Sequence, residues 1–263
     1  MPDQDRIEKI SQHLYEAHTS KSNFRNLENE LKPLSEHDAY EIQRNLNRLW
    51  EKNKRGTLVG HKVALTSKAI QELVGTDAPV KGSIFSSTIH QSPAEINIDN
   101  FVHLGLEFEL AFLMGKDVPK SNSYNTHSIS EFIDSAMPAF ELIEDRNADY
   151  RNIDPLTLIA DNAWCGGVVL GTPSQHWRNI DLSSRQVNLL FNNEIEEAIT
   201  GAAMGNPLNS VAWLASFLSE QGRPLKKGDI VMSGSTLATK FAKRGDTAVY
   251  TIEGLGKVEV IIR

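Results

Sequence analysis

Apolar residues recur at helical spacing within the first fifty residues of the chain. Ala39, Ile42 and Leu46 follow one another at three- and four-residue steps, the interval at which side chains share one face of a helix. Ser35 stands just ahead of them, and serine is a favoured N-cap. The pattern therefore predicts a helical N-terminal region, which we assign to residues 1–57.

Beyond residue 57 the pattern changes to short runs rich in valine, isoleucine, phenylalanine and leucine, which predict strands. These runs cover residues 58–65, 107–113, 138–144, 229–232, 247–252 and 257–262. Two helices are predicted among them: one opened by a Ser128/Glu131 capping box and reaching Met137, and one over residues 207–221 closed by Gly222. The prediction is an α+β protein whose strand-rich body spans residues 58–263.

Composition narrows the classes of partner. The 263 residues are 40% hydrophobic and 23% charged, with a formal net charge of −7, values typical of a folded globular protein. The negative charge argues against nucleic-acid binding, and the apolar runs are too short to cross a bilayer. The single cysteine, Cys165, excludes an intramolecular disulfide. We therefore expect a cytoplasmic protein that binds a small molecule.

Three glutamates lie in apolar strand segments. Glu107 and Glu109 are two residues apart, so strand alternation places both on one face. This spacing is usually a solvated face, but the flanking residues are apolar, and an unpaired buried carboxylate is costly. Glu141 is likewise flanked by apolar residues. Three converging carboxylates would suit Mg²⁺ or Mn²⁺ better than zinc.

Lys62 is the other charged residue of note, because it interrupts the apolar segment 58–65. One interpretation is a lysine that extends its charged end to solvent or pairs with an acid. The alternative is a lysine beside the metal, whose pKa is lowered by burial and by the neighbouring positive charge, and which then transfers protons near neutral pH. The spacing alone leaves both open.

Taken together, these segments resemble the 2-keto-4-pentenoate hydratase and 4-oxalocrotonate decarboxylase family of the fumarylacetoacetate hydrolase superfamily. The matching stretches are AYEIQ at 39–43, VGHKVALTSKAIQ at 59–71, LEFELAF at 106–112, MPAFELIEDR at 137–146, IADNA at 159–163, NPLNSVAWLA at 206–215 and GDIVMSGS at 228–235. The resemblance implies a mixed, highly curved β body of the fumarylacetoacetate hydrolase C-terminal type over residues 58–263. It also implies a homo-oligomer that can associate with a related pathway enzyme.

The resemblance also assigns roles to individual residues. It implies Mg²⁺ or Mn²⁺ held by Glu107, Glu109 and Glu141, with Lys62 as the acid/base group. The residues that it places beside the substrate are Leu65, Thr66, Val80, Gly234 and Ser235.

The implied activity is that of a lyase on a small 2-oxo or 2-hydroxydienoate from aromatic-ring cleavage. We favour a hydratase of 2-hydroxypenta-2,4-dienoate. Similar hydratases carry an acid where this chain has Val80, so decarboxylation of 4-oxalocrotonate is the alternative. Related sequences have a small residue where this chain has Trp164. A second alternative is an acylpyruvate hydrolase, for which no His–Glu pair is evident in the N-terminal part, and a third is an inactive partner subunit.

Overall fold

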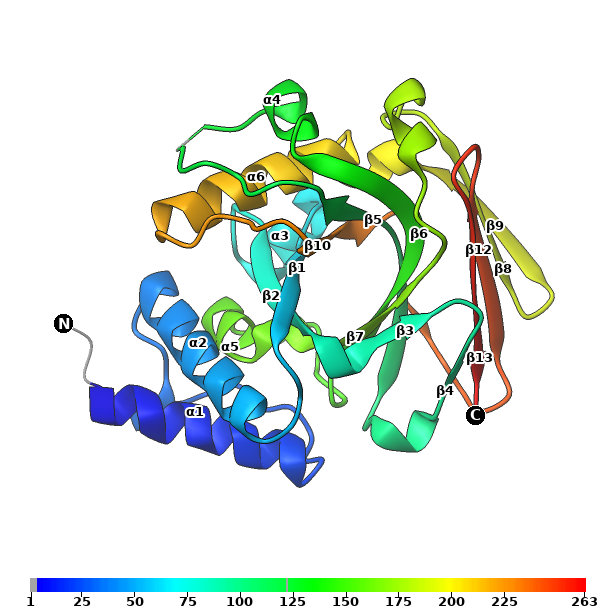
Figure 1. Cartoon of the computed structure of the whole chain (residues 1–263). Coiled ribbons are helices and arrows are strands. Elements are labelled where there is room, and N and C mark those ends of the chain that lie inside the picture. Colours follow the sequence, from blue (N-terminus) through cyan, green and yellow to red (C-terminus); the bar gives the residue numbers. More distant parts are fainter. Residues whose placement is uncertain (1–3, 122) are drawn as a thin grey trace.

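Two long helices at the N-terminus pack on each other and beside the β body (Figure 1). They are α1 (Gln4–Thr19) and α2 (Glu36–Lys52) of a computed structural model that describes residues 4–121 and 123–263. Ile42 and Leu46 are fully buried along one face of α2. The Ser35 hydroxyl accepts a hydrogen bond from the Asp38 amide at 3.2 Å. The predicted helix and its N-cap are therefore confirmed.

Removing this cap has a measurable expected cost. Ser35→Ala leaves the Asp38 amide without its side-chain acceptor, which should lower the free energy of unfolding by about 1 kcal/mol. Urea denaturation followed by circular dichroism measures the change. Ser35→Thr keeps the hydroxyl and should stay near the wild-type value; equal losses in both variants would contradict the capping role.

The other four helices lie between strands. They are α3 (Lys68–Val74), α4 (Thr126–Ser130), α5 (Pro155–Ala160) and α6 (Pro207–Glu220). The strands are β1 (Leu58–Ala64), β2 (Val80–Phe85), β3 (Ile89–Gln91), β4 (Ala94–Ile96), β5 (Leu104–Met114), β6 (Ile133–Glu144), β7 (Cys165–Leu170), β8 (Gln186–Phe191), β9 (Glu194–Ile199), β10 (Ile230–Ser235), β11 (Lys240–Phe241), β12 (Thr247–Ile252) and β13 (Gly256–Ile262). None of the described helices combines the length and the apolar character needed to span a bilayer.

The strands form two mixed sheets. The larger has the order β2-β1-β10-β5-β6-β7-β3, with β11 added beside β5, and the smaller has the order β4-β13-β12-β8-β9. Figure 1 shows the larger sheet curling around a central space, with β12 and β13 outside β6. Parallel pairs, such as β1 with β10, occur beside antiparallel ones. The predicted α+β class, with a curved mixed β body and a helical N-terminal region, is confirmed.

The predicted helix from Ser128 to Met137 is wrong. Asn125 is the N-cap, it forms a capping box with Ser128, and the helix α4 ends at Ser130. From Ile133 onward the chain enters β6, which pairs with β5 along almost its whole length. Ile133 and Met137 are buried. Pairing and burial in the sheet therefore override the local helical signal.

Sheet order brings the distant sequence motifs together. Strands β1, β10, β5 and β6 are successive neighbours in the larger sheet. They carry, in that order, Lys62, Gly234, the glutamate pair, and Glu141. Four segments separated by up to about 170 residues thus meet on adjacent strands.

Candidate active site

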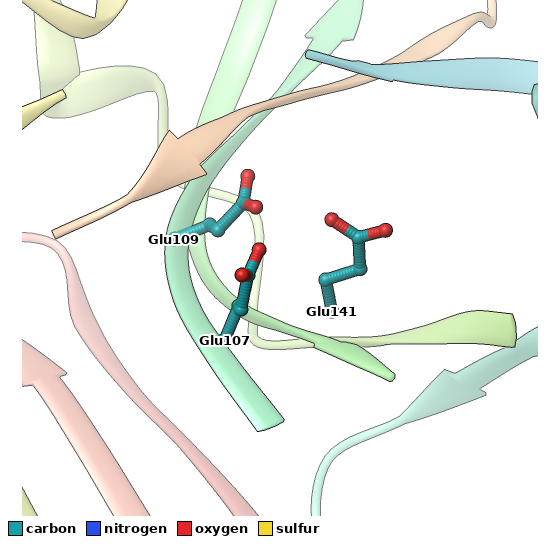
Figure 2. Close-up of side chains that lie close together, drawn as sticks. All are labelled: Glu107, Glu109 and Glu141. Atoms are coloured by element: carbon teal, nitrogen blue, oxygen red, sulfur yellow. The ribbon is translucent and has the colours of Figure 1, made fainter. Parts of the chain in front are cut away.

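The three glutamates converge on one face of the larger sheet. Glu107 and Glu109 both project from β5, and Glu141 projects from β6 directly opposite Glu107 in the register. One carboxylate oxygen from each lies within 4.8 Å of the others. Figure 2 shows the three carboxylates turned toward a common space. An all-oxygen donor set of this kind fits a hard divalent cation.

Some of these carboxylate oxygens have donors and others do not. Glu109 Oε2 accepts from the Gly234 amide at 2.7 Å, and Glu107 Oε1 accepts from the Thr239 hydroxyl at 3.0 Å. Glu109 Oε1 and Glu141 Oε2 are buried without a hydrogen-bond partner. Burying carboxylate oxygens in this state is costly unless a cation binds them. The residues present therefore fit a metal ion.

The pKa values of Glu109 and Glu141 are both raised, as expected for buried carboxyl groups that lie close together. Burial, followed by repulsion from Glu141 and Glu107, raises the pKa of Glu109 well above its ordinary value. Burial also raises the pKa of Glu141 to about 7, although the Lys62 ammonium opposes the shift. Without an added cation, burial and mutual repulsion thus favour the protonated form of each carboxyl group.

Lys62 lies beside this carboxylate cluster and is 2% exposed. Its Nζ atom is 2.9 Å from Glu141 Oε1. Burial alone would lower the pKa of Lys62, but the charges of Glu141 and Glu107 outweigh it and raise the pKa. The protein groups by themselves thus hold Lys62 as an ammonium; the lowered pKa expected from the sequence refers to the site with a cation present.

A cavity of about 280 Å³ opens next to the cluster. Of the residues predicted beside the substrate, Leu65, Thr66, Gly234 and Ser235 line it, together with Lys62 and Glu107. Its remaining wall is mostly apolar: Ile70, Val74, Ile143, Ile153, Leu158 and Trp164 contribute. This shape suits a small elongated molecule with one polar end.

Gly234 is required by its surroundings. Its φ is +102°, and a Cβ atom at this position would lie 2.5 Å from the Thr66 side chain. A glycine adopts this conformation without strain, and it allows the amide to reach Glu109. The close approach of β10 to Thr66 therefore helps to position one of the three carboxylates.

Comparisons with known proteins agree with this arrangement. The sequence model of the fumarylacetoacetate (FAA) hydrolase C-terminal family matches residues 57–263. The chain belongs to this family. A 2-keto-4-pentenoate hydratase of Paraburkholderia xenovorans is 33% identical over 256 residues, covering 95% of this chain and 93% of the relative. The resemblance inferred from the sequence motifs is confirmed.

Two further proteins extend the comparison. A 2-hydroxyhexa-2,4-dienoate hydratase of Comamonas testosteroni is 29% identical over 265 residues, covering 99% of this chain and 98% of the relative. The solved 4-oxalocrotonate decarboxylase of Pseudomonas putida, complexed with magnesium and adipate, superposes with a TM-score of 0.92 at 23% identity. That comparison covers 100% of this chain and 99% of the decarboxylase. At this identity, the superposition shows a shared fold.

Val80 lies outside the cavity beside the glutamates. It is 2% exposed and belongs to the hydrophobic cluster of α2 and α5, where Phe85, Ile159 and Ala160 also lie. The residue that replaces the acid of similar hydratases is thus a core residue in this member of the family. Nearby Gly82 does affect the site, because a Cβ atom there would lie 3.1 Å from Lys62 Cγ.

Sequence reasoning missed one aromatic part of the cavity. Tyr150 lines the cavity with Trp164, and their rings meet edge to face with centroids 5.4 Å apart. The Tyr150 hydroxyl donates to Asp145 at 3.0 Å. Trp164 was recognised in the sequence as unusual, whereas Tyr150 comes from a loop without any periodic pattern. Only the fold brings the two rings together.

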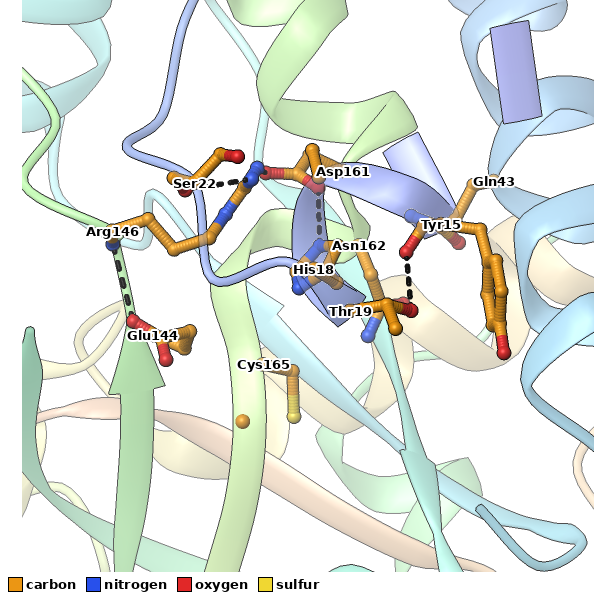
Figure 3. A network of polar contacts seen from close by, with 12 residues as sticks. Tyr15, His18, Thr19, Ser22, Gln43, Glu144, Arg146, Asp161, Asn162 and Cys165 are labelled. Atoms are coloured by element: carbon orange, nitrogen blue, oxygen red, sulfur yellow. Dashed lines mark hydrogen bonds and ion pairs between the residues drawn. The ribbon is translucent and has the colours of Figure 1, made fainter. Parts of the chain in front are cut away.

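A buried ion-pair network anchors the N-terminal helix near the site (Figure 3). His18 Nε2 lies 2.6 Å from Asp161 Oδ1, and Arg146 donates to Asp161 Oδ2 at 2.5 Å. Arg146 thus forms its ion pair with Asp161 and not with the adjacent Asp145. Because His18 and Asp161 are 143 residues apart in the chain, the sequence alone does not predict this pair. His18 does not line the cavity beside Glu107, so the network is structural.

Proposed function

We propose that the protein is a Mg²⁺- or Mn²⁺-dependent hydratase of a 2-hydroxy-2,4-dienoate, of the 2-keto-4-pentenoate hydratase type, acting on products of aromatic-ring cleavage. The observation that carries the proposal is the cluster of Glu107, Glu109 and Glu141, with oxygens lacking donors, beside Lys62 and a largely apolar cavity. The hydratase relatives support the same activity.

The chain's own residues supply the proton transfers. When bound by the three glutamates, the metal ion supplies a Lewis acid that polarises the oxygens at the carboxylate end of the substrate. Lys62 is buried beside these glutamates as an ammonium, and a cation bound in the cluster would lower its pKa and release one proton to solvent. The neutral amine would then take the proton of the substrate 2-hydroxyl group and return it to C5 of the substrate. Gly234 and Thr239 hold the glutamates in place through their hydrogen bonds. A water molecule, the second substrate, would then add across the alkene of the resulting 2-oxo-3-enoate, with the hydroxyl group at C4 and a proton at C3.

The cavity wall also bears on the choice between hydration and decarboxylation. Among the described residues that line the cavity, Lys62 is the only lysine or arginine. A dioate such as 4-oxalocrotonate carries a second carboxylate, which needs a cationic or hydrogen-bonding partner when buried. Ile70, Val74 and Ile153 offer none. Apart from Lys62, the polar groups of the wall are hydroxyl groups such as those of Ser67 and Tyr150, so the lack of a second cation among the described lining residues supports a monocarboxylate with an apolar tail.

A comparison of two substrates tests the proposal. With Mg²⁺ present, the protein should convert 2-hydroxypenta-2,4-dienoate to a hydrated 4-hydroxy-2-oxo acid, followed by loss of the dienoate absorbance. It should release little CO₂ from 2-oxo-3-hexenedioate. CO₂ release without turnover of the dienoate would instead establish the decarboxylase, and cleavage of an acylpyruvate would establish the hydrolase.

The raised carboxyl pKa values give a pH prediction for metal binding. The pKa of Glu141 is raised to about 7, so below pH 7 a cation must displace a bound proton, while above it the carboxylate is already free. Mg²⁺ affinity should therefore fall by about tenfold per pH unit below 7 for each proton released. Calorimetry in two buffers of different ionisation enthalpy measures the release. Affinity that is constant between pH 6 and 8 would contradict the shift.

We also propose that the protein works in the cytoplasm as a homo-oligomer that can associate with a related pathway enzyme. Light scattering on the purified protein gives the mass of the assembly. A monomer with full activity would show that the site is complete within one chain.

A further inference from the structure

A second cavity lies on the other side of strand β1 from the carboxylates. It has a volume of about 560 Å³ and lies between α2, the end of α6, and strands β1 and β2, elements that adjoin one another in Figure 1. His61 lines this cavity, whereas the next residue, Lys62, lines the catalytic one. Successive side chains of a strand point to opposite faces, so β1 separates two independent binding regions.

The lining of the second cavity is strongly basic. Two acidic side chains, Glu51 and Asp229, contribute to it. The cationic side chains are five: Arg44, Arg48, Lys81, Arg223 and Lys226. This excess of positive charge occurs in a chain whose net charge is −7. A concave surface of one sign concentrates counter-ions of the other.

Three of these cations have no acidic partner. Arg44 pairs with Glu41, and Lys226 pairs with Asp117 at 3.1 Å. Among the residues that the structure describes, no carboxylate forms an ion pair with Arg48, Lys81 or Arg223. Five cations thus face two carboxylates in this cavity, and none of these three cations is paired directly with a carboxylate of the described residues.

Of the three, Lys81 has the greatest need of a counter-ion, because it is only 4% exposed. Its Nζ donates to the neutral Gln43 side chain and lies 5.1 Å from the centre of the Tyr40 ring. Burial, then repulsion from Arg44 and Arg223, lowers the pKa of Lys81 to about 7. A buried cation in these surroundings is unfavourable, and a bound anion would restore its charged form.

Two further buried side chains at the second cavity have polar atoms without a hydrogen-bond partner. His61, 8% exposed, has no partner for Nδ1, and Asn47, 6% exposed, has none for Oδ1. Both side chains line the cavity. The neutral imidazole of His61 donates its N–H to the Gly82 backbone, so its Nδ1, like the Asn47 amide oxygen, can accept from a hydroxyl group of a partly protonated phosphate. The cavity therefore contains both charges and polar groups that a ligand would satisfy.

We infer that this second cavity binds a small dianion, either a phosphate or a dicarboxylate, at Lys81, Arg48 and Arg223. The site is distinct from the catalytic cavity and is not needed for the hydratase chemistry. Both ligand types share two negative charges and several acceptor oxygens, which guanidinium groups bind by paired hydrogen bonds. The Asn47 oxygen is better satisfied by phosphate.

Calorimetric titration of the Mg²⁺-loaded protein tests the site, with inorganic phosphate in one arm and succinate in the other at constant ionic strength. We expect saturable binding of at least one anion. Arg223→Gln and Arg48→Gln should each weaken it at least about tenfold. Lys227→Gln is the matched control, because it removes the same charge from an exposed residue outside the cavity; its affinity should stay within about twofold of wild type.

Each outcome has a defined meaning. Phosphate binding without succinate binding, or the reverse, identifies the anion class. Absence of saturable binding in both arms overturns the inference. Equal weakening by Lys227→Gln and Arg223→Gln also overturns it, because that result indicates general screening. A change in the mass of the assembly in Arg223→Gln, with anion affinity unchanged, would assign the basic cavity to a contact between subunits instead.

Discussion

Glu109→Gln is expected to abolish metal-dependent turnover and at the same time to make the metal-free protein more stable. The glutamine keeps an acceptor for the Gly234 amide but removes one of three crowded carboxylates. Loss of a ligand should lower metal affinity by more than about 100-fold, the upper end of the loss seen for an outer-shell partner. Relief of repulsion should raise the free energy of unfolding by ~1 kcal/mol at pH 8.

The matched variant Glu141→Gln separates these two effects. It also removes a ligand, so turnover should be lost to a similar degree. In the metal-free protein, however, it leaves the buried Lys62 ammonium without its partner at 2.9 Å, so stability should fall and not rise. Denaturation in EDTA and in Mg²⁺ distinguishes the two variants. If both keep wild-type turnover, the three glutamates do not hold a catalytic metal, and the inactive-subunit alternative gains support.

Lys62→Met should lower kcat by about 10²–10⁴-fold, the usual contribution of a positioned acid or base. The methionine retains the apolar stem that lies over Gly82 and removes the proton carrier. Metal affinity should be unchanged or increased, because a positive charge beside the cluster is lost. Steady-state assays with 2-hydroxypenta-2,4-dienoate and direct Mg²⁺ titration measure the two quantities.

The combination of results is decisive for Lys62. A large fall in kcat with intact Mg²⁺ binding supports proton transfer. If kcat falls together with Mg²⁺ affinity, and excess Mg²⁺ restores it, then Lys62 only positions the carboxylates. Ser67→Ala, in the same cavity wall, serves as the control for local disturbance and should change kcat by less than about tenfold.

The parts of the site that lie on strands were predictable from the sequence. Glu107 and Glu109 share a face because a strand repeats every two residues, and their apolar neighbours indicated burial. Glu141 and Lys62 interrupt similar apolar runs. The direct pairing of Glu107 with Glu141 depends on the register between two segments, which spacing does not determine; the family resemblance implied only that both residues hold the metal.

The parts that depend on contacts between distant loops were not predictable. The capping signal at Ser128 and Glu131 lies just before a strand whose pairing partner is determined elsewhere in the chain. Tyr150 and the His18 pair with Asp161 owe their positions to tertiary packing. The position of Val80 was also not predictable. The family resemblance placed it beside the substrate, whereas the fold places it in a neighbouring hydrophobic core.

Strand β1, with His61 and Lys62 pointing to opposite sides, restricts how this protein can change through evolution or engineering. Insertion of a single residue early in β1 would turn Lys62 toward the basic cavity and present a different side chain to the carboxylates. Insertions and deletions here would thus damage two binding regions at once. Substitutions can alter either region separately, so variants with new specificity should be sought by point replacement in β1 and by length changes only in the loops outside it.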